Sequence, residues 1–366
     1  MRGPAIPANA SDIDAAWLEA ALRQGGHLNE GRIASVTGDA IGVGVGLMGE
    51  LRRFEIVYDG AADGAPASVV VKLPSPAPEN FNIGKAMHLY AREYGFYRHL
   101  AAQSPVRAPA LLYGDFDDDS HRFALVLEDL SGMVSPDQIE GASAEQARLA
   151  VREIAKLHGT FWGRVDEGPM AAFFDLAHPE YCGAVQMGYY AYLQPTLETF
   201  GDFFKPELRA LAENYAPKLA QHLAGVSGQH RTFIHGDFRL DNMFFGQPGE
   251  DRFCAVDWQI SGRGAGLYDV AYFLAGSVAT EVRRQIEDAA LAEYCDIVCA
   301  MGAQDFSVEE CRRQYREAML ACLIVPIYVC GALDLGNDRG RLLAEIGLER
   351  GLAAIEDTNA GEFLPA

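Results

Sequence analysis

The segment from His235 to Asn242 carries the most constraining pattern in this chain. It reads His-Gly-Asp-Phe-Arg-Leu-Asp-Asn, so Asp237 and Asn242 lie five residues apart. An apolar run, a turn with glycine and proline and a second apolar run then predict a hairpin over residues 243–256. Asp257 follows this hairpin directly, so Asn242 and Asp257 are expected at neighbouring ends of two paired strands.

Three oxygen-bearing side chains that converge in this way suit phosphoryl transfer. One carboxylate, Asp237, would hold and deprotonate an acceptor hydroxyl, while the amide of Asn242 and the carboxylate of Asp257 would ligate Mg²⁺ beside a triphosphate. For Asp257 alone, an ordinary strand end is the simpler interpretation. The whole set predicts a kinase.

The same segment resembles the small-molecule kinases of the protein-kinase-like fold, the superfamily of aminoglycoside phosphotransferases and choline kinases. Asp257-Trp258-Gln259, followed by Tyr-Asp-Val-Ala-Tyr-Phe-Leu at 268–274, is most similar to the ecdysteroid-kinase-like branch. The resemblance covers nearly the whole chain in motif order. It implies an α+β bilobal fold, with a small β-rich ATP-binding lobe over 1–128 and a larger, mainly helical catalytic and substrate-binding lobe over 129–366. The His-Arg-Asp, Asp-Phe-Gly and Ala-Pro-Glu motifs of protein kinases are absent, so no protein substrate is expected.

Glycines upstream favour a nucleotide site. Gly44, Gly46 and Gly49 stand in a Gly-x-Gly-x-x-Gly register, and residues 50–58 after them look like a strand. A dinucleotide-binding turn would open a helix instead. Strand, glycines and strand together predict a hairpin that covers phosphates; a glycine-rich turn without a ligand stays open as the alternative.

A strand-like run over 67–73 carries one lysine, Lys72. A lysine in a buried strand needs a partner, and the helical spacing of apolar residues around Glu93 places this carboxylate on a helix that can pack there. The resemblance implies a Lys-Glu pair with the lysine on the α- and β-phosphates. A solvated Lys72 with an exposed Glu93, or a pair with Glu79, remains open.

Residues 123–130 predict a strand that runs into the linker between the lobes. The resemblance implies that main-chain groups of Glu128 and Leu130 bond adenine, whereas Asp129 caps the turn.

Charge limits the partners of this chain. Its 51 acidic and 30 basic residues give a formal net charge of −21, which argues against nucleic acid and anionic membrane surfaces. The same charge repels ATP, so local cations must offset it. Candidates are Mg²⁺, Lys72, Arg239, which stands two positions after Asp237, and Arg263, for which a solvated loop residue is the alternative.

Location follows from the cysteines and the apolar stretches. The seven cysteines lack metal-like spacing, which indicates buried thiols in a reducing cytoplasm, and no secretory signal opens the chain. The run over 318–333 would span about 24 Å as a helix, shorter than a bilayer core of about 30 Å, and Pro326 interrupts it. A buried helix is therefore predicted rather than a membrane span, and nothing fixes an oligomeric state.

Several residues of the larger lobe are expected to serve structure. Ser143 begins a capping box, His158 is expected to be a hydrogen-bonded packing residue, and His235 to anchor the catalytic loop. Asp269 is expected to cap the next helix and, by the resemblance, to bond the loop backbone.

The acceptor is the least constrained part. Residues 181–204 hold seven aromatic side chains and only two acids, Glu198 and Asp202. Such a stripe is usually core, but the resemblance places the acceptor pocket here. Aromatic walls suit an apolar secondary alcohol better than an aminoglycoside or choline. A nucleotide-binding pseudokinase and a phosphatase-like hydrolase are further alternatives.

Overall fold

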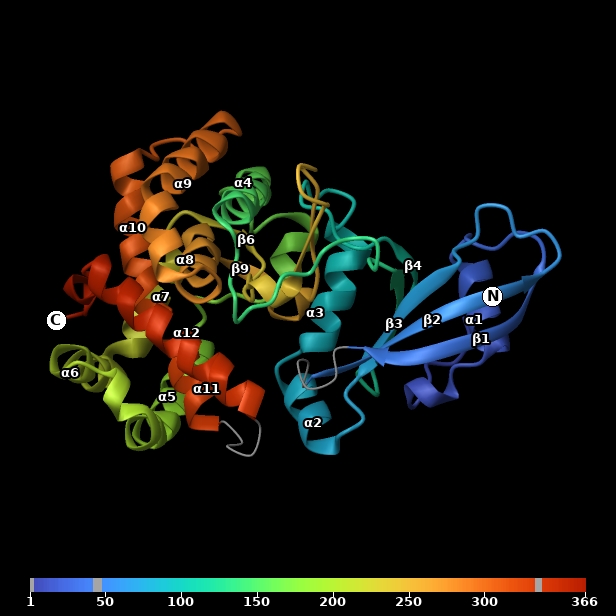
Figure 1. Ribbon diagram of the computed structural model, residues 1–366, viewed down its shortest axis with the longest axis horizontal. Helices are drawn as coiled ribbons and strands as arrows, with labels where there is room; N and C mark the ends of the chain where they lie inside the picture. The colour runs from blue at the N-terminus through green and yellow to red at the C-terminus, as the bar shows by residue number, and fades with distance from the viewer. Residues whose placement is uncertain (1–2, 42–47, 333–337) are drawn as a thin grey trace. The chain divides into compact units, whose positions relative to one another are not determined.

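The computed structural model describes residues 3–41, 48–332 and 338–366, which form two compact units (Figure 1). One unit comprises Met1–Gln103, Arg107–Met133 and Ala255–Ile260, and the other comprises Ser104–Val106, Val134–Cys254 and Ser261–Ala366. The first is rich in strands and the second is mainly helical, so the predicted α+β class is confirmed. Gly44 and Gly46 lie outside the described residues.

An antiparallel sheet of five strands, in the order β1-β2-β3-β5-β4, forms the first unit. The strands expected over 50–58, 67–73 and from 123 are confirmed. The strand bounds are Arg32–Ile41 (β1), Gly49–Asp59 (β2), Ser68–Pro74 (β3), Leu111–Asp117 (β4) and Arg122–Glu128 (β5).

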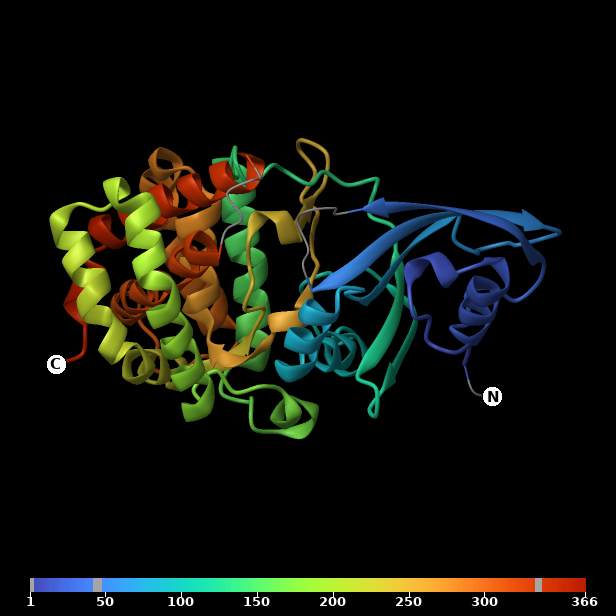
Figure 2. The ribbon, with the colours of Figure 1, turned by 90° about the horizontal axis from the view of Figure 1, so that it is seen from below.

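Among the described residues, the first unit has three α-helices. They are α1 (Ala15–Gln24), α2 (Pro78–Ala86) and α3 (Leu89–Gly95), which continues into a π-helical turn, Phe96–Leu100. Helices α1 and α3 pack on the sheet, and α2 packs on α3. Strand β3 shows why Lys72 points where it does. Val71 and Leu73 belong to the core beneath α1, which Figure 2 shows against one face of the sheet. Because side chains alternate along a strand, Lys72 takes the opposite face, toward α3.

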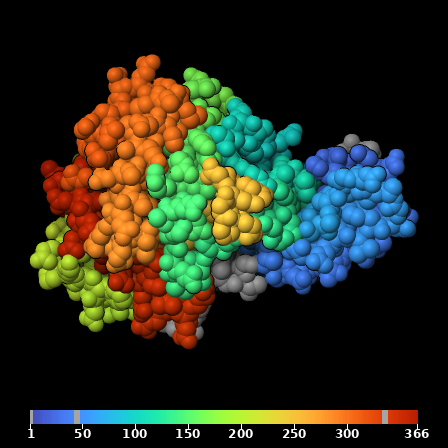
Figure 3. Space-filling view, turned by 45° about the horizontal axis from the view of Figure 1, so that its top comes forward, coloured from blue at the N-terminus to red at the C-terminus, as the bar shows by residue number. Residues whose placement is uncertain are grey.

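The second unit is a helical assembly with two short strand pairs. Its helices are α4 (Ala144–Phe161), α5 (Pro179–Phe200), α6 (Pro206–Tyr215), α7 (Leu219–Gly228), α8 (Gly266–Ser277), α9 (Thr280–Ala300), α10 (Val308–Ala321), α11 (Ile324–Ala332) and α12 (Asp338–Asp357). Strand β6 (Arg231–Ile234) pairs with β9 (Gly262–Ala265), and β7 (Met243–Phe245) pairs with β8 (Phe253–Ala255), which confirms the predicted hairpin. Helix α4 packs along α9, and Figure 3 shows their green and orange surfaces adjoining. The capping box at Ser143 is present.

The apolar stretch near the C-terminus forms two helices rather than the single one predicted. The break at Cys322 and Leu323 has a local cause, since the ring of Pro326 disfavours a helical carbonyl four residues earlier. Val308–Ala332 is long and apolar enough to cross a membrane by length and composition alone, but 61% of its most apolar window is buried within the protein.

All seven cysteines are free thiols. Six are buried as expected, whereas Cys299 on α9 is exposed. Its helix turns this position outward, although the Cys299 thiol still donates to the Phe306 carbonyl at 3.1 Å.

Candidate active site

Lys72, Glu93 and Asp257 form a compact charged cluster in the first unit. The Lys72 Nζ lies 2.9 Å from Glu93 Oε1 and 2.8 Å from Glu93 Oε2, and it donates to Asp257 Oδ1 at 3.1 Å. Lys72 and Glu93 are buried, while the Asp257 side chain is 34% exposed. The Lys72–Glu93 pair expected from the sequence is therefore present, and Glu79 is not the partner.

The electrostatics of this cluster leave Lys72 charged. Burial opposes the charge on Lys72, but the carboxylates of Asp257 and Glu93 outweigh that effect and raise its pKa. Burial also raises the pKa of Glu93, against the attraction of Lys72. One buried ammonium thus faces two carboxylates, and the more exposed of the two, Asp257, is the one able to meet an added cation.

Asp257 is held in an unusual backbone conformation by its neighbour. Its φ is 64°, in the left-handed region that aspartate tolerates better than most residues. Trp258, which is fully buried, stacks on Phe96 with ring centroids 3.7 Å apart and donates from Nε1 to the Ala255 carbonyl at 3.2 Å. This anchored indole fixes the turn that presents Asp257, a role that the sequence pattern alone did not identify.

Gly49 is the one residue of the predicted glycine motif that the structure both describes and places at the cluster. It opens β2, opposite Pro74 of β3. A Cβ at this position would lie 3.2 Å from Lys72 Cε, so a larger residue would press on the lysine. Glycine here keeps space beside the ammonium.

Main-chain groups of the linker residues Glu128 and Leu130 already form hydrogen bonds within the protein. The Glu128 amide donates to the Ala110 carbonyl at 2.9 Å, and the Leu130 carbonyl accepts from Met133 at 2.8 Å. The Glu128 amide is therefore already bonded within the protein, and the adenine contacts expected of Glu128 and Leu130 stay a prediction. Asp129 caps the turn as expected, because its Oδ1 accepts from the Ser131 amide, and its Oδ2 also binds Arg53 at 2.6 Å.

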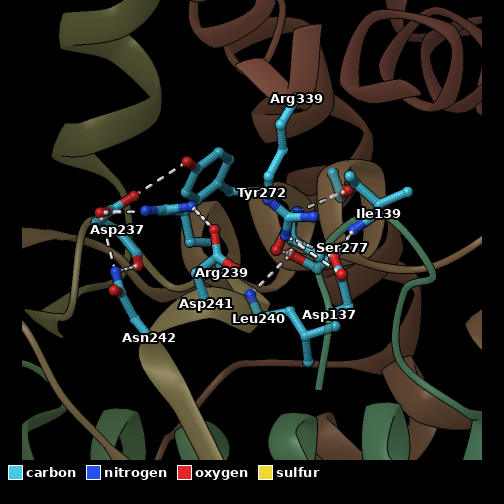
Figure 4. A network of polar contacts seen from close by, with 12 residues as sticks. Asp137, Ile139, Asp237, Arg239, Leu240, Asp241, Asn242, Tyr272, Ser277 and Arg339 are labelled. Atoms are coloured by element: carbon cyan, nitrogen blue, oxygen red, sulfur yellow. Dashed lines mark hydrogen bonds and ion pairs between the residues drawn. The ribbon is translucent and has the colours of Figure 1, made fainter. Parts of the chain in front are cut away.

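Asp237 lies in the second unit, where three side chains hold its carboxylate (Figure 4). Tyr272 Oη donates to Oδ1 at 3.0 Å, Asn242 Nδ2 donates to Oδ2 at 2.9 Å, and Arg239 Nε lies 3.5 Å from Oδ2. Asn242 Nδ2 also donates to the Asp237 carbonyl at 2.9 Å. Both partners of that nitrogen are acceptors, so the amide is oriented and its oxygen is the atom left for a metal.

The two arginines considered for the phosphates differ. Arg239 stays beside Asp237 and is paired with Asp241. Burial opposes its charge, but the Asp237 and Asp241 carboxylates raise its pKa. Arg263 belongs to β9 rather than to a loop, and its Nη1 lies 2.6 Å from Asp166 Oδ1. The predicted solvated loop position of Arg263 was wrong, because the residue belongs to a paired strand and its side chain is only 15% exposed. Its contribution at the phosphates stays a prediction.

Asp269 of helix α8 holds the start of the catalytic loop through two hydrogen bonds. Asp269 Oδ2 accepts from the His235 amide at 2.7 Å and Oδ1 accepts from the Gly236 amide at 2.8 Å, while His158 Nε2 donates to Oδ2 at 3.2 Å. The expected cap was wrong, since α8 begins three residues earlier and Ala265 is its N-cap. His158 is hydrogen-bonded and buried, as predicted.

Tyr272 was missed from the sequence. Its spacing of three residues from Asp269 was the available signal, because residues three apart share a helix face. Burial and the Asp237 carboxylate raise the pKa of Tyr272, so its hydroxyl remains a donor.

Each of the two predicted metal ligands offers the kind of oxygen atom that magnesium prefers. Within the described ranges no group of three or more His, Cys, Asp or Glu side chains could hold a metal. Magnesium keeps several waters and uses one or two protein carboxylates, so the predicted ligands Asn242 and Asp257 need no such cluster.

The protein-kinase-like fold and these residues define the class of a phosphotransferase. Residues 52–306 match the model of the "Phosphotransferase enzyme family". The chain therefore belongs to this family, within the superfamily that its motifs resemble, whereas the ecdysteroid-kinase-like branch stays a prediction.

Solved structures with this fold cover nearly all of the chain. A candidate aminoglycoside phosphotransferase from Ralstonia eutropha JMP134 is 18% identical with a TM-score of 0.54, covering 93% of this chain and 97% of its own. Choline kinase from Cryptosporidium parvum Iowa II is 12% identical with a TM-score of 0.52, covering 90% and 92%. An amicoumacin kinase, solved with AMP-PNP, Ca²⁺ and Ami, is 14% identical with a TM-score of 0.54 and the same coverage. At these identities they show the fold alone. No curated protein matches this chain significantly.

Proposed function

We propose that this protein transfers the γ-phosphoryl group of ATP, in the presence of Mg²⁺, to a hydroxyl group of a small molecule. Residues 1–128 would supply most of the nucleotide site, and 129–366 would supply catalysis and the acceptor site. The seven free thiols fit a reducing cytoplasm.

The observation that carries the proposal is the environment of Asp237. An ionised carboxylate offers about four lone-pair positions. In the part of the chain that the structure describes, Asn242 donates to Oδ2, Arg239 forms an ion pair with the same oxygen, and Tyr272 donates to Oδ1. The position left on Oδ1 can accept a hydroxyl proton. A carboxylate fixed in this way orients an alcohol and holds its proton during attack.

Lys72, Asn242 and Asp257 would bind the nucleotide. The Lys72 ammonium, held by Glu93, would meet phosphate oxygens. Asn242 through its oxygen and Asp257 through its carboxylate would hold Mg²⁺, which when bound neutralises charge on the phosphates. Lys72 and Arg239 offset part of the net charge of −21. Together these residues also disfavour a phosphatase-like hydrolase, which would have no use for the lysine.

Aromatic side chains of the second unit support an apolar acceptor, and one of them, Tyr272, donates to Asp237. Tyr272 stacks with Tyr268 one turn away, with ring centroids 6.1 Å apart. Burial raises the pKa of Tyr268, and its neighbours, which include Tyr181 of α5, add to the effect. Tyr192 of α5 contacts Tyr328 of α11, with ring centroids 5.2 Å apart. All five rings are partly exposed and belong to the second unit, as Asp237 does.

The aromatic side chains over 181–204 thus fall into three groups by burial, and Tyr190 and Phe203 form the exposed group. Tyr189, Phe200 and Phe204 are core, as is usual for such stripes, whereas Tyr181 and Tyr192 are half-buried. The two acids of this stretch are exposed. We infer an apolar secondary alcohol as acceptor, because half-buried aromatic rings suit it better than a polycation.

An acceptor panel tests both levels of the proposal. ADP release is measured with apolar secondary alcohols, kanamycin-like aminocyclitols and choline, each against a reaction without acceptor and against Asp237→Asn. Stimulation by the apolar alcohols is expected. Stimulation only by cationic acceptors would reject the acceptor class but keep the kinase. ADP release independent of acceptor would indicate a hydrolase, and nucleotide binding without turnover on any acceptor a pseudokinase.

A further inference from the structure

The far end of the catalytic loop is anchored by a residue outside the motif. The Leu240 amide, buried between Arg239 and Asp241, donates to Ser277 Oγ at 3.0 Å (Figure 4). Ser277 is the last residue of α8 and is fully buried. Helix α8 therefore holds the loop at three points: Asp269 at its start, Tyr272 at Asp237, and Ser277 at its end.

Ser277 is in turn held by the segment before α4. Its hydroxyl donates to Gln138 Oε1 at 3.2 Å, and Gln138 Nε2 donates to the Gly276 carbonyl at 3.0 Å. The Ala142 amide donates to the Ser277 carbonyl at 2.8 Å. The hydroxyl thus accepts from the loop and donates to Gln138, so its orientation is fixed from both sides.

Arg350 of α12 joins this segment to the end of α8. Its Nη1 donates to the Gln138 carbonyl at 2.9 Å and contacts the Gly276 carbonyl at 3.4 Å. Its Nη2 donates to the Ile139 carbonyl at 2.7 Å and contacts that of Glu140 at 3.3 Å. The side chain is buried, and within the described residues it forms no ion pair with a carboxylate. The buried Arg350 guanidinium donates to main-chain carbonyls of residues 138–140 and to one in the last turn of α8. It therefore cross-links this segment to the end of the helix.

We propose that Ser277 and Arg350 are positioning residues for phosphoryl transfer. Ser277 sets the backbone of residues 239–241 through the Leu240 amide, and Arg350 keeps Ser277 and Gln138 in register. Arg239 and Asn242, which contact the Asp237 carboxylate, flank this anchor. The catalytic part of the inference rests on the proposed function, whereas the anchoring of the loop does not.

The same helix offers a matched control. Arg339, at the other end of α12, pairs with Asp137 at 3.1 Å, but its side chain is 56% exposed. Ser277→Ala and Arg350→Met are therefore compared with Arg339→Met. Amide hydrogen exchange of a peptide covering 238–245 measures how well the loop is held, without any substrate. The kcat and the KM for ATP measure the effect on the reaction.

Ser277→Ala should speed exchange of the Leu240 amide by about 10- to 100-fold, because the amide loses its acceptor. It should lower kcat by about 10- to 100-fold and change KM for ATP by less than about twofold, since a misplaced loop affects the reacting groups more than nucleotide binding. Arg350→Met should also speed loop exchange and lower kcat. Arg339→Met should leave the exchange rate and kcat within about twofold of the parent protein.

Unchanged loop exchange in Ser277→Ala would overturn the anchoring. Exchange that rises equally across α4 and α9 would also overturn it, because the residues would then serve general stability. Faster loop exchange with unchanged kcat would overturn the catalytic role. Faster loop exchange in a protein that phosphorylates no acceptor would support the anchor and reject the proposed function instead.

Discussion

Asp237→Asn isolates the basicity of one carboxylate with little change in its surroundings. An asparagine can turn its oxygen toward Asn242, which donates to Oδ2 in the parent protein, and toward the nearby Arg239. Its nitrogen then faces Tyr272, whose hydroxyl can rotate from donor to acceptor. The two hydrogen bonds of the parent carboxylate can be replaced and Arg239 keeps its pair with Asp241, so the variant should fold normally. What it lacks is a group that can take a proton.

The expected loss follows from the contribution of a positioned base. General base catalysis contributes about 10²–10⁴ in rate, which corresponds to about 3–5 kcal/mol of barrier. We expect kcat for the preferred acceptor to fall by that factor while the Kd for Mg-ATP stays within about threefold. Single-turnover ADP formation measures the first quantity, and calorimetric titration with a non-hydrolysable ATP analogue measures the second. Turnover within about fivefold of the parent would refute the assignment of Asp237 as base.

Three further perturbations extend the test. Asp257→Asn keeps a residue tolerant of left-handed backbone but removes the charge, so Mg-ATP turnover should fall by at least about 100-fold in steady-state assays; a nucleotide-bound crystal with the metal held elsewhere would contradict this. Lys72→Ala should raise KM for ATP more than that for the acceptor, with Glu93→Ala milder, and unchanged nucleotide affinity in both would reject the pair as a phosphate site. Burial lowers the pKa of His222 to about 4 from 6.5, so between these two pH values the neutral form is favoured only in the folded protein. The corresponding stability is present above pH 6.5 and lost as pH falls toward 4, by about 2 kcal/mol at pH 5. Denaturant unfolding at pH 7.5 and 5 measures the free energy of unfolding of the parent protein and of His222→Gln. The loss of stability between these pH values should be smaller in the variant, and an equal loss in both proteins would contradict the assignment.

Local patterns predicted much of the fold and part of the site. The hairpin over 243–256 follows from two apolar runs and a turn, and the helix that carries Glu93 follows from helical spacing, whereas its pairing with Lys72 was implied by the resemblance. The hairpin and the helix each depend on a pattern that a single segment displays. The capping box at Ser143 is a local signal of the same kind.

Other features depend on tertiary contacts that no period encodes. Ser277 meets Leu240 across 37 positions, and Arg350 reaches carbonyls more than 200 positions away. Every residue carries a main-chain carbonyl, so the residue types do not reveal which carbonyls an arginine binds. A buried arginine of this kind therefore cannot be told from a surface arginine in the sequence. Asp269 was assigned to a cap because helix starts are uncertain by a few residues, and Arg263 was misjudged because the β6–β9 pairing is non-local.

The left-handed backbone at Asp257 bears on what directed evolution of this protein would recover. Glycine adopts a φ of 64° without the strain that a side chain brings, so selection for thermal stability alone would favour glycine at this codon. Selection for turnover would retain the carboxylate instead. A library at position 257 sorted alternately under the two pressures should therefore separate into two populations. The split would measure, at one position, how much stability the protein forgoes to keep its function.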